Sequence, residues 1–321
     1  MKSSNELNKN KIELNKRESK DLFINLKSDY FLQKLFNNLL KKKSLDIIKY
    51  NKKIKSKINI SIKDYKEYSE IYSPTEIVIK PVNYKYGQFI NFNQKNEKYY
   101  HIYFNNNKEE IKRYYLNENE NVEKLKIIID YQIKSFERLF KDCECIEYIY
   151  IKKFNINIKN MEFMFFGCCT LKEINLSKFN TNNVINMESM FDGCSALKEL
   201  DLSNFNTNNV INMRFMFSGC SALTKLNLSN FNTNNVTDME AMLCQCSSLK
   251  ELNLSNFNTN NVIHMSYMFY RCYELKELNI SNCNTNNVKF MRNMFSGCLN
   301  KFQNKIRTQY KNIKDYAFDN Y

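Results

Sequence analysis

Six cysteines recur along the second half of the chain at a constant interval of 26 residues. They are Cys168, Cys194, Cys220, Cys246, Cys272 and Cys298. Self-similarity at a fixed spacing of this size is typical of arrays in which each copy packs mainly on its neighbours. One copy is too short to bury its own apolar side chains, so the copies have to stack. The spacing therefore predicts an elongated solenoid.

Each copy begins with a segment that has the pattern of a short strand. In the unit over residues 194–219, Leu200 and Leu202 alternate with polar residues, as in a strand with one buried face and one face in water. The preceding Leu197 completes an L-x-x-L-x-L motif, which at this repeat length is typical of leucine-rich repeats. We therefore expect the strands to form a parallel sheet along one side of the array.

The second part of each copy has the spacing of a two-turn helix. Its apolar stripe consists of Val210, Met213, Met216 and Phe217. Asn212 is placed to cap this helix and Gly219 to end it. At Gln245 and Arg271, which replace that glycine, we expect a different helix exit because a left-handed residue other than glycine is strained. The predicted class is thus α/β, a leucine-rich-repeat solenoid of parallel strands and short helices.

The hexapeptide FNTNNV connects the strand to this second part. It stands in identical form at residues 179–184, 205–210, 231–236 and 257–262, and with a leading cysteine at 283–288. Three asparagines and a threonine could form a ligand-binding signature or a structural corner. The position favours the corner, where short polar side chains bond to backbone groups that no strand or helix satisfies. We also expect identical asparagines to bond from one copy to the next.

Four segments organise the chain. Residues 1–27 form a basic arm that we expect to be disordered, and residues 28–123 an α+β region with a helix pair followed by short antiparallel strands. The solenoid covers 124–300, with 124–130 as its first strand. A C-terminal capping helix covers 301–321, and its apolar stripe is Phe302, Ile306, Tyr310, Ile313 and Ala317.

Charge is concentrated at the N-terminus. Residues 1–60 hold 16 Lys and Arg against 6 Asp and Glu, within a net charge of +14 for the chain. A basic arm of this kind could contact nucleic acid or an anionic membrane, although a general richness in Lys and Asn explains it equally well. The first twenty residues contain no apolar signal segment, and no later run is long enough to span a bilayer. We therefore expect a cytoplasmic protein.

The residues needed for catalysis are scarce. The chain has two histidines, His101 and His264, in unrelated contexts, and no glycine-rich phosphate loop. None of the cysteine pairs has the C-x2-C spacing of structural zinc, which favours a buried column of reduced thiols. The sequence predicts a protein that is not an enzyme, with no catalytic residues, no cofactor and no metal site.

The units NMESMFDGCSALKELDLSNFNTNNV and DMEAMLCQCSSLKELNLSNFNTNNV resemble BspA-like leucine-rich repeats, also called mycoplasma lipoprotein-type repeats. The resemblance covers about residues 133–300. It implies a role in protein binding or adhesion, often at the cell surface, so a surface adhesin exported without a recognisable signal is an alternative. Residues 28–61 resemble an F-box, without its usual Leu-Pro, and would imply an adaptor that presents bound proteins to a ubiquitin ligase.

Solenoids of this kind commonly bind partners through the exposed face of the sheet, which is the candidate site here. We expect a monomer that binds an unidentified protein, with the distinctive first copy as the first contact, because aromatic side chains often anchor interfaces. The predicted face consists of Tyr148, Tyr150, Lys152, Glu173, Asn175, Glu199, Asp201, Lys225, Asn227, Glu251, Asn253, Glu277 and Asn279.

Overall fold

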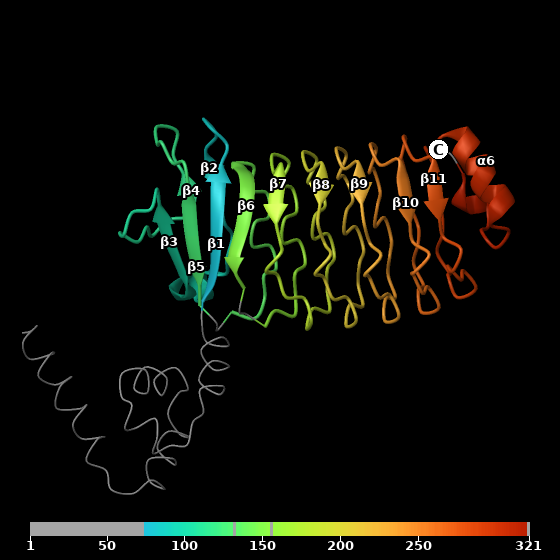
Figure 1. Ribbon diagram of the computed structural model, residues 1–321, viewed down its shortest axis with the longest axis horizontal. Helices are drawn as coiled ribbons and strands as arrows, with labels where there is room; N and C mark the ends of the chain where they lie inside the picture. Colours follow the sequence, from blue (N-terminus) through green and yellow to red (C-terminus); the bar gives the residue numbers. More distant parts are fainter. Residues whose placement is uncertain (1–73, 131–132, 155–156, 320–321) are drawn as a thin grey trace, which may run out of the picture. The chain divides into compact units, whose positions relative to one another are not determined.

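The computed structural model describes residues 74–130, 133–154 and 157–319. The basic arm over 1–27 and the helix pair expected over 28–61 lie outside these ranges. The described part is a strand-rich repeat solenoid with few helices, in which strands β6 to β11 follow one another along a row (Figure 1).

A five-stranded sheet begins the described part, in the order β3-β5-β1-β6-β7. Its strands are β1 (Thr75–Pro81), β3 (Tyr100–Phe104), β5 (Leu125–Ile129), β6 (Ile146–Lys153) and β7 (Glu173–Asn175). Strand β5 pairs antiparallel with both β1 and β3, so the prediction that 124–130 is the first strand of a parallel array is wrong. The strand itself is where the sequence predicts it, but its direction depends on β1, which lies between β5 and β6 and pairs antiparallel with both.

Three smaller elements lie between β1 and β5 in the chain. They are β2 (Gly87–Gln88), the 3-10 helix η1 (Gln94–Tyr99) and β4 (Tyr115–Leu116). Strands β2 and β4 pair antiparallel, and Ile111 bridges Ile102 at the outer strand β3. The small antiparallel unit predicted before the array is therefore present: β1, β3 and β5 share one sheet with β6 and β7, and β2 and β4 form a separate pair.

The later copies contribute short parallel strands. These are β8 (Glu199–Leu200), β9 (Lys225–Leu226), β10 (Glu251–Asn253) and β11 (Glu277–Asn279). In each described pair, equivalent residues of successive copies face one another: Leu200 pairs with Leu226, and Leu252 with Leu278. A second parallel ladder links the other side of the copies through isolated bridges, as between Asn160 and Asn186.

The predicted two-turn helices are wrong. Residues 213–220 form three overlapping β-turns, in which the N–H groups of Met216, Ser218 and Cys220 each bond to the carbonyl three residues earlier. The alternate N–H groups, starting at Met213, bond to carbonyls of the next copy at 2.8 to 3.0 Å. A helix would satisfy all its bonds internally, whereas here half of them join neighbouring copies. Asn212 still caps the segment, because its Oδ1 accepts the N–H of Arg214 at 2.9 Å.

The end of each turn segment is left-handed whatever residue stands there. Gly219 has φ +68°, but Gln245 and Arg271 adopt φ +58° and +57° with the same bond to the next copy. The different exit predicted at these two positions is therefore wrong. Because the inter-copy bonds hold this backbone in place, they outweigh the strain of a side chain in the left-handed region.

The core consists of columns of identical side chains. Phe165, Phe191 and Phe217 stack with ring centroids 5.4 and 5.9 Å apart, and Phe179 stacks on Phe205 at 5.9 Å. All eleven cysteines are free, and the six that define the spacing are buried, which confirms the predicted column of thiols. The S–H of Cys220, for example, donates to the carbonyl of Phe191 at 3.2 Å.

The hexapeptide forms the corner that its position predicted. In each copy the threonine is buried and the asparagines bond to the neighbouring copy: Asn232 Nδ2 donates to Asn208 Oδ1 at 2.9 Å, and Asn235 Nδ2 to the carbonyl of Asn208 at 2.7 Å. The expected ladder of asparagines is confirmed. The corner's amides are thus engaged in joining copies.

Helix α6 (Asn300–Gln309) follows the last strand and buries Phe302, Gln303 and Ile306. It is shorter than the stripe predicted: the chain turns after Tyr310, and Ala317 is buried from the 3-10 helix η2 (Asp315–Ala317). Within the described residues, α6 is the longest helix at ten residues, and none has the length and hydrophobicity that crossing a bilayer requires.

Candidate binding face

The exposed side of the strands carries all thirteen residues of the predicted face. Tyr148 and Asn175 are half-buried, and the other eleven are exposed. Parallel pairing brings equivalent positions together, so that Tyr150 lies beside Asn175, Glu251 beside Glu277, and Asn253 beside Asn279. The leucines between them point into the core. The face is therefore a set of polar columns on a rigid support.

The central column has a structural role that the sequence did not reveal. Asn227, Asn253 and Asn279 each accept, through Oδ1, the N–H of the serine two residues later at 3.0 to 3.1 Å. Asp201 does the same, and the bonds from Ser203 hold the pKa of its carboxyl below the usual range. These turns end the strands and fix the side chains. These bonds use only the Oδ1 atom, so the amide N–H2 of each asparagine is still able to donate to a partner.

A groove of about 790 Å³ is hollowed into the last three copies of this face. Its floor is formed by residues of β9, β10 and β11, and Lys305 and Gln309 of α6 contribute to its wall. Lys305 forms an ion pair with Glu277. Sequence reasoning missed both helix residues, because the strand pattern does not show that α6 lies beside the sheet surface.

The three side chains that distinguish the first copy are Tyr148, Tyr150 and Lys152. Lys80 lies 4.8 Å from the ring centre of Tyr148, and Lys152 Nζ lies 3.6 Å from Glu76 Oε1. Both partners belong to β1, which pairs directly with β6. Two of the three distinctive side chains therefore already have intramolecular partners. Tyr150 is 48% exposed and remains accessible.

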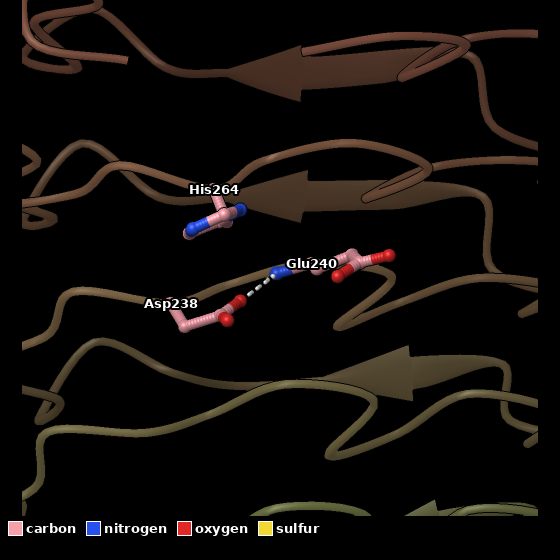
Figure 2. Close-up of side chains that lie close together, drawn as sticks. All are labelled: Asp238, Glu240 and His264. Atoms are coloured by element: carbon pink, nitrogen blue, oxygen red, sulfur yellow. Dashed lines mark hydrogen bonds between the residues drawn. The ribbon is translucent and has the colours of Figure 1, made fainter. Parts of the chain in front are cut away.

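Another group of polar side chains lies in the turn segments, away from the strand face. Asp238 and Glu240 come from one copy and His264 from the next, as Figure 2 shows. One potential ligand atom from each residue lies within 4.8 Å of the other two. Nitrogen and carboxylate oxygen at this spacing could hold a metal ion, although the sequence predicted no metal site.

Two overlapping matches to one protein-family model cover residues 134–250 and 223–318. The model describes a Mycoplasma protein of unknown function, DUF285. A search of curated proteins returned no significant match. A search of solved structures likewise returned none.

Proposed function

Because the chain belongs to the DUF285 family of Mycoplasma proteins of unknown function, we propose that it serves as a non-enzymatic scaffold that binds another protein through its exposed strand face. The observation that carries this proposal is the groove over β9 to β11. It runs across three copies and is bounded by α6. A polar groove that crosses several strands of a repeat array can accommodate an extended segment of a partner protein.

The groove offers hydrogen-bond donors and acceptors in repeated positions. Amides of Asn227, Asn253 and Asn279 line it together with the carboxylates of Glu251 and Glu277. Such a surface favours a polar segment whose backbone or side chains match the spacing of the copies, about 4.8 Å. Because hot-spot aromatic residues are lacking in the groove, we expect modest affinity, with Tyr150 as an accessory contact.

Four narrower assignments belong to the same proposal. We assign the array to the BspA-like leucine-rich repeats with a 26-residue period, and α6 to the role of a cap. Since α6 follows one end and Ile111 bridges the outer strand β3 at the other, we propose a monomer. We place the protein in the cytoplasm, because passage through a eukaryotic secretory pathway would expose the sequons beginning at Asn227, Asn253 and Asn279 to glycosylation, which would obstruct the groove.

Site-specific photo-crosslinking in the native cell tests the proposal. A photoreactive phenylalanine analogue is placed at Asn253 in the groove, at Tyr150 in the first copy, and at Ile211, which is 47% exposed and precedes a turn segment. We expect one discrete protein adduct from position 253, a weaker one from position 150, and none from position 211. Mass spectrometry identifies the adduct.

A substitution in the groove then tests whether the identified protein binds there. The variant Glu251→Arg places a long charged side chain in the groove and leaves the buried Leu252 and the turn bond between Asn253 and Ser255 intact. It should reduce capture of the identified protein by at least tenfold without changing the melting temperature. Equal capture by this variant, or the same adduct from position 211, would count against the strand face as the binding surface.

A further inference from the structure

We propose that Asp238, Glu240 and His264 form a binding site for a divalent transition-metal ion, with Zn²⁺ as the best fit. The site joins two neighbouring copies of the array. It is separate from the strand face and does not depend on the protein-binding function proposed above.

The three side chains converge from two copies. Asp238 and Glu240 lie on the same turn segment, and His264 lies at the position equivalent to Asp238 one copy later (Figure 2). All three are half-buried, and one ligand atom of each lies within 4.8 Å of the others. Donors around Zn²⁺ lie about 2.0 to 2.2 Å from the ion and so about 3 to 3.5 Å from one another, which small side-chain rotations would achieve.

The site stands where the array departs from its own pattern. In the preceding copies this column holds asparagine, whose amide donates to a glutamate of the copy before: Asn186 Nδ2 to Glu162 Oε2 at 3.0 Å, and Asn212 Nδ2 to Glu188 Oε2 at 2.9 Å. Asp238 replaces the amide donor with a carboxylate. The copy before holds Arg214 at the position of the glutamate, so the asparagine–glutamate bond is interrupted at Asp238, and its carboxylate becomes available as a ligand.

The ring nitrogens of His264 are available to bind a metal ion. Across the part of the chain that the structure describes, neither of its ring nitrogens has a hydrogen bond or an ion pair. Its ring stacks on Phe290 with centroids 4.5 Å apart and planes 8° from parallel. This stacking restricts the ring orientation, which reduces the entropy lost when a nitrogen binds a metal.

The carboxylates are held by bonds that leave ligand atoms available. Asp238 Oδ1 accepts the N–H of Glu240 at 2.8 Å, and Glu240 Oε2 lies 3.0 Å from Arg214 Nε. Each carboxylate therefore has a second oxygen for the ion. Arg214 opposes a cation by its charge, but the two carboxylates exceed it by one negative charge. Such supporting contacts also orient ligands and raise affinity.

The ligand set decides the class of ion. An imidazole nitrogen together with carboxylate oxygens suits Zn²⁺ and related transition metals better than Ca²⁺, which prefers six or more oxygen atoms. Three protein ligands leave a coordination position for water or for a side chain of another protein. The proposed ion would join copies at a point where the asparagine bonds are interrupted.

Isothermal titration of the purified full chain with ZnCl2 tests the site. The variants Asp238→Asn and His264→Asn introduce the residue that the same column already holds at Asn186 and Asn212, so folding should be retained. We expect one Zn²⁺ per chain and at least a hundredfold loss of affinity in either variant. His101→Asn, in which the other histidine is changed, is the matched control and should bind as the wild type does.

Imidazole ¹H–¹⁵N spectra provide a second readout that does not depend on stability. The chain contains two histidines, and the His101→Asn variant assigns their signals. Zn²⁺ should shift the signals of His264 and leave those of His101 unchanged. Titration with Co²⁺ checks that the ion does not bind cysteine, since thiolate ligands would produce an intense charge-transfer band. Unchanged affinity in His264→Asn, a shift of His101 alone, or a thiolate band would overturn the proposal.

Discussion

Thr233 Oγ1 donates a hydrogen bond to the carbonyl of Asn258 at 2.9 Å and accepts the N–H of the same residue at 2.8 Å. One buried hydroxyl thus satisfies both backbone groups of a residue in the next copy. Thr181 and Thr207 form the same pair of bonds with Asn206 and Asn232. The threonine column therefore joins successive corners in the way that a ladder joins strands.

The variant Thr233→Val tests the contribution of this contact. Valine keeps the shape of threonine but removes the donor and the acceptor, which leaves the N–H and the carbonyl of the half-buried Asn258 without these partners. Because each unsatisfied group costs about 1 to 3 kcal/mol, we expect a loss of at least 2 kcal/mol in the free energy of unfolding. Urea denaturation followed by circular dichroism measures it.

Thr224→Val is the matched control in the same copy. Thr224 is exposed, and its hydroxyl makes one long bond of 3.4 Å to the carbonyl of Lys198. Its replacement should change the stability by less than about 0.5 kcal/mol. Equal losses in the two variants would contradict the role assigned to the buried hydroxyl.

The corner shows how far the sequence could predict the fold. Position within the copy was enough to place Phe205 inside and the asparagines at the bend, because polarity and turn preference are local properties. The same reasoning misread the segment with Met213, Met216 and Phe217 as a helix, although it identified their burial correctly. A three-and-four apolar spacing describes which side chains share a face. It does not show that half of the N–H groups bond to another copy.

The candidate site was predictable to a similar extent. Alternation along the strands identified the exposed residues of the face, since a period of two assigns each side chain to one side of a sheet. The groove was not predictable, because Lys305 and Gln309 reach it from α6, outside the repeat. The position of His264 beside Asp238 followed from the repeat length alone. That Glu240 also lies close to both residues depends on the path of the turn segment, which the sequence pattern does not show.

Asp192 makes the stability depend on pH. Burial raises the pKa of its carboxyl from 3.8 to about 6, against weaker opposing bonds from Ser218 and Ser189. A raised pKa means that ionisation is less favourable in the folded state than in the unfolded chain. The contribution of Asp192 to stability is therefore largest below about pH 4 and falls as the pH rises through 6.

The variant Asp192→Asn removes that penalty. We expect a gain of about 1 kcal/mol at pH 7.5, after discounting for the part of the carboxyl that water screens, and no gain near pH 4. Urea denaturation at both pH values measures the difference. Asp201→Asn, where hydrogen bonds from Ser203 lower the pKa of the exposed carboxyl, should show no gain at pH 7.5. An equal gain at both pH values would contradict the assignment.

The buried thiols should resist alkylation until the protein unfolds. Thiolate is the reactive form, and burial raises the pKa of Cys145 to about 11 and that of Cys298 to about 12. Cys169 is half-buried and serves as the internal comparison. Iodoacetamide at pH 8 should modify Cys169 first and Cys246 only in denaturant, as measured by peptide mass spectrometry. Native labelling of Cys246 at the rate of Cys169 would show that the column opens.

The variant Gly219→Ala tests whether the left-handed end of the turn segment requires glycine where Gly219 lies against Gly193 of the copy before. A Cβ added there would lie 3.2 Å from the backbone nitrogen of Gly193, and the backbone has φ +68°. Left-handed backbone costs alanine about 1 kcal/mol, and the close approach adds to it, so Gly219→Ala should lose about 1 to 2 kcal/mol in urea denaturation. Gln245→Ala is the control, because Gln245 already holds φ +58° with a side chain, and it should lose less than about 0.5 kcal/mol. If both variants unfold at the same urea concentration as the wild type, the backbone is held by the inter-copy bonds alone and glycine has no special role.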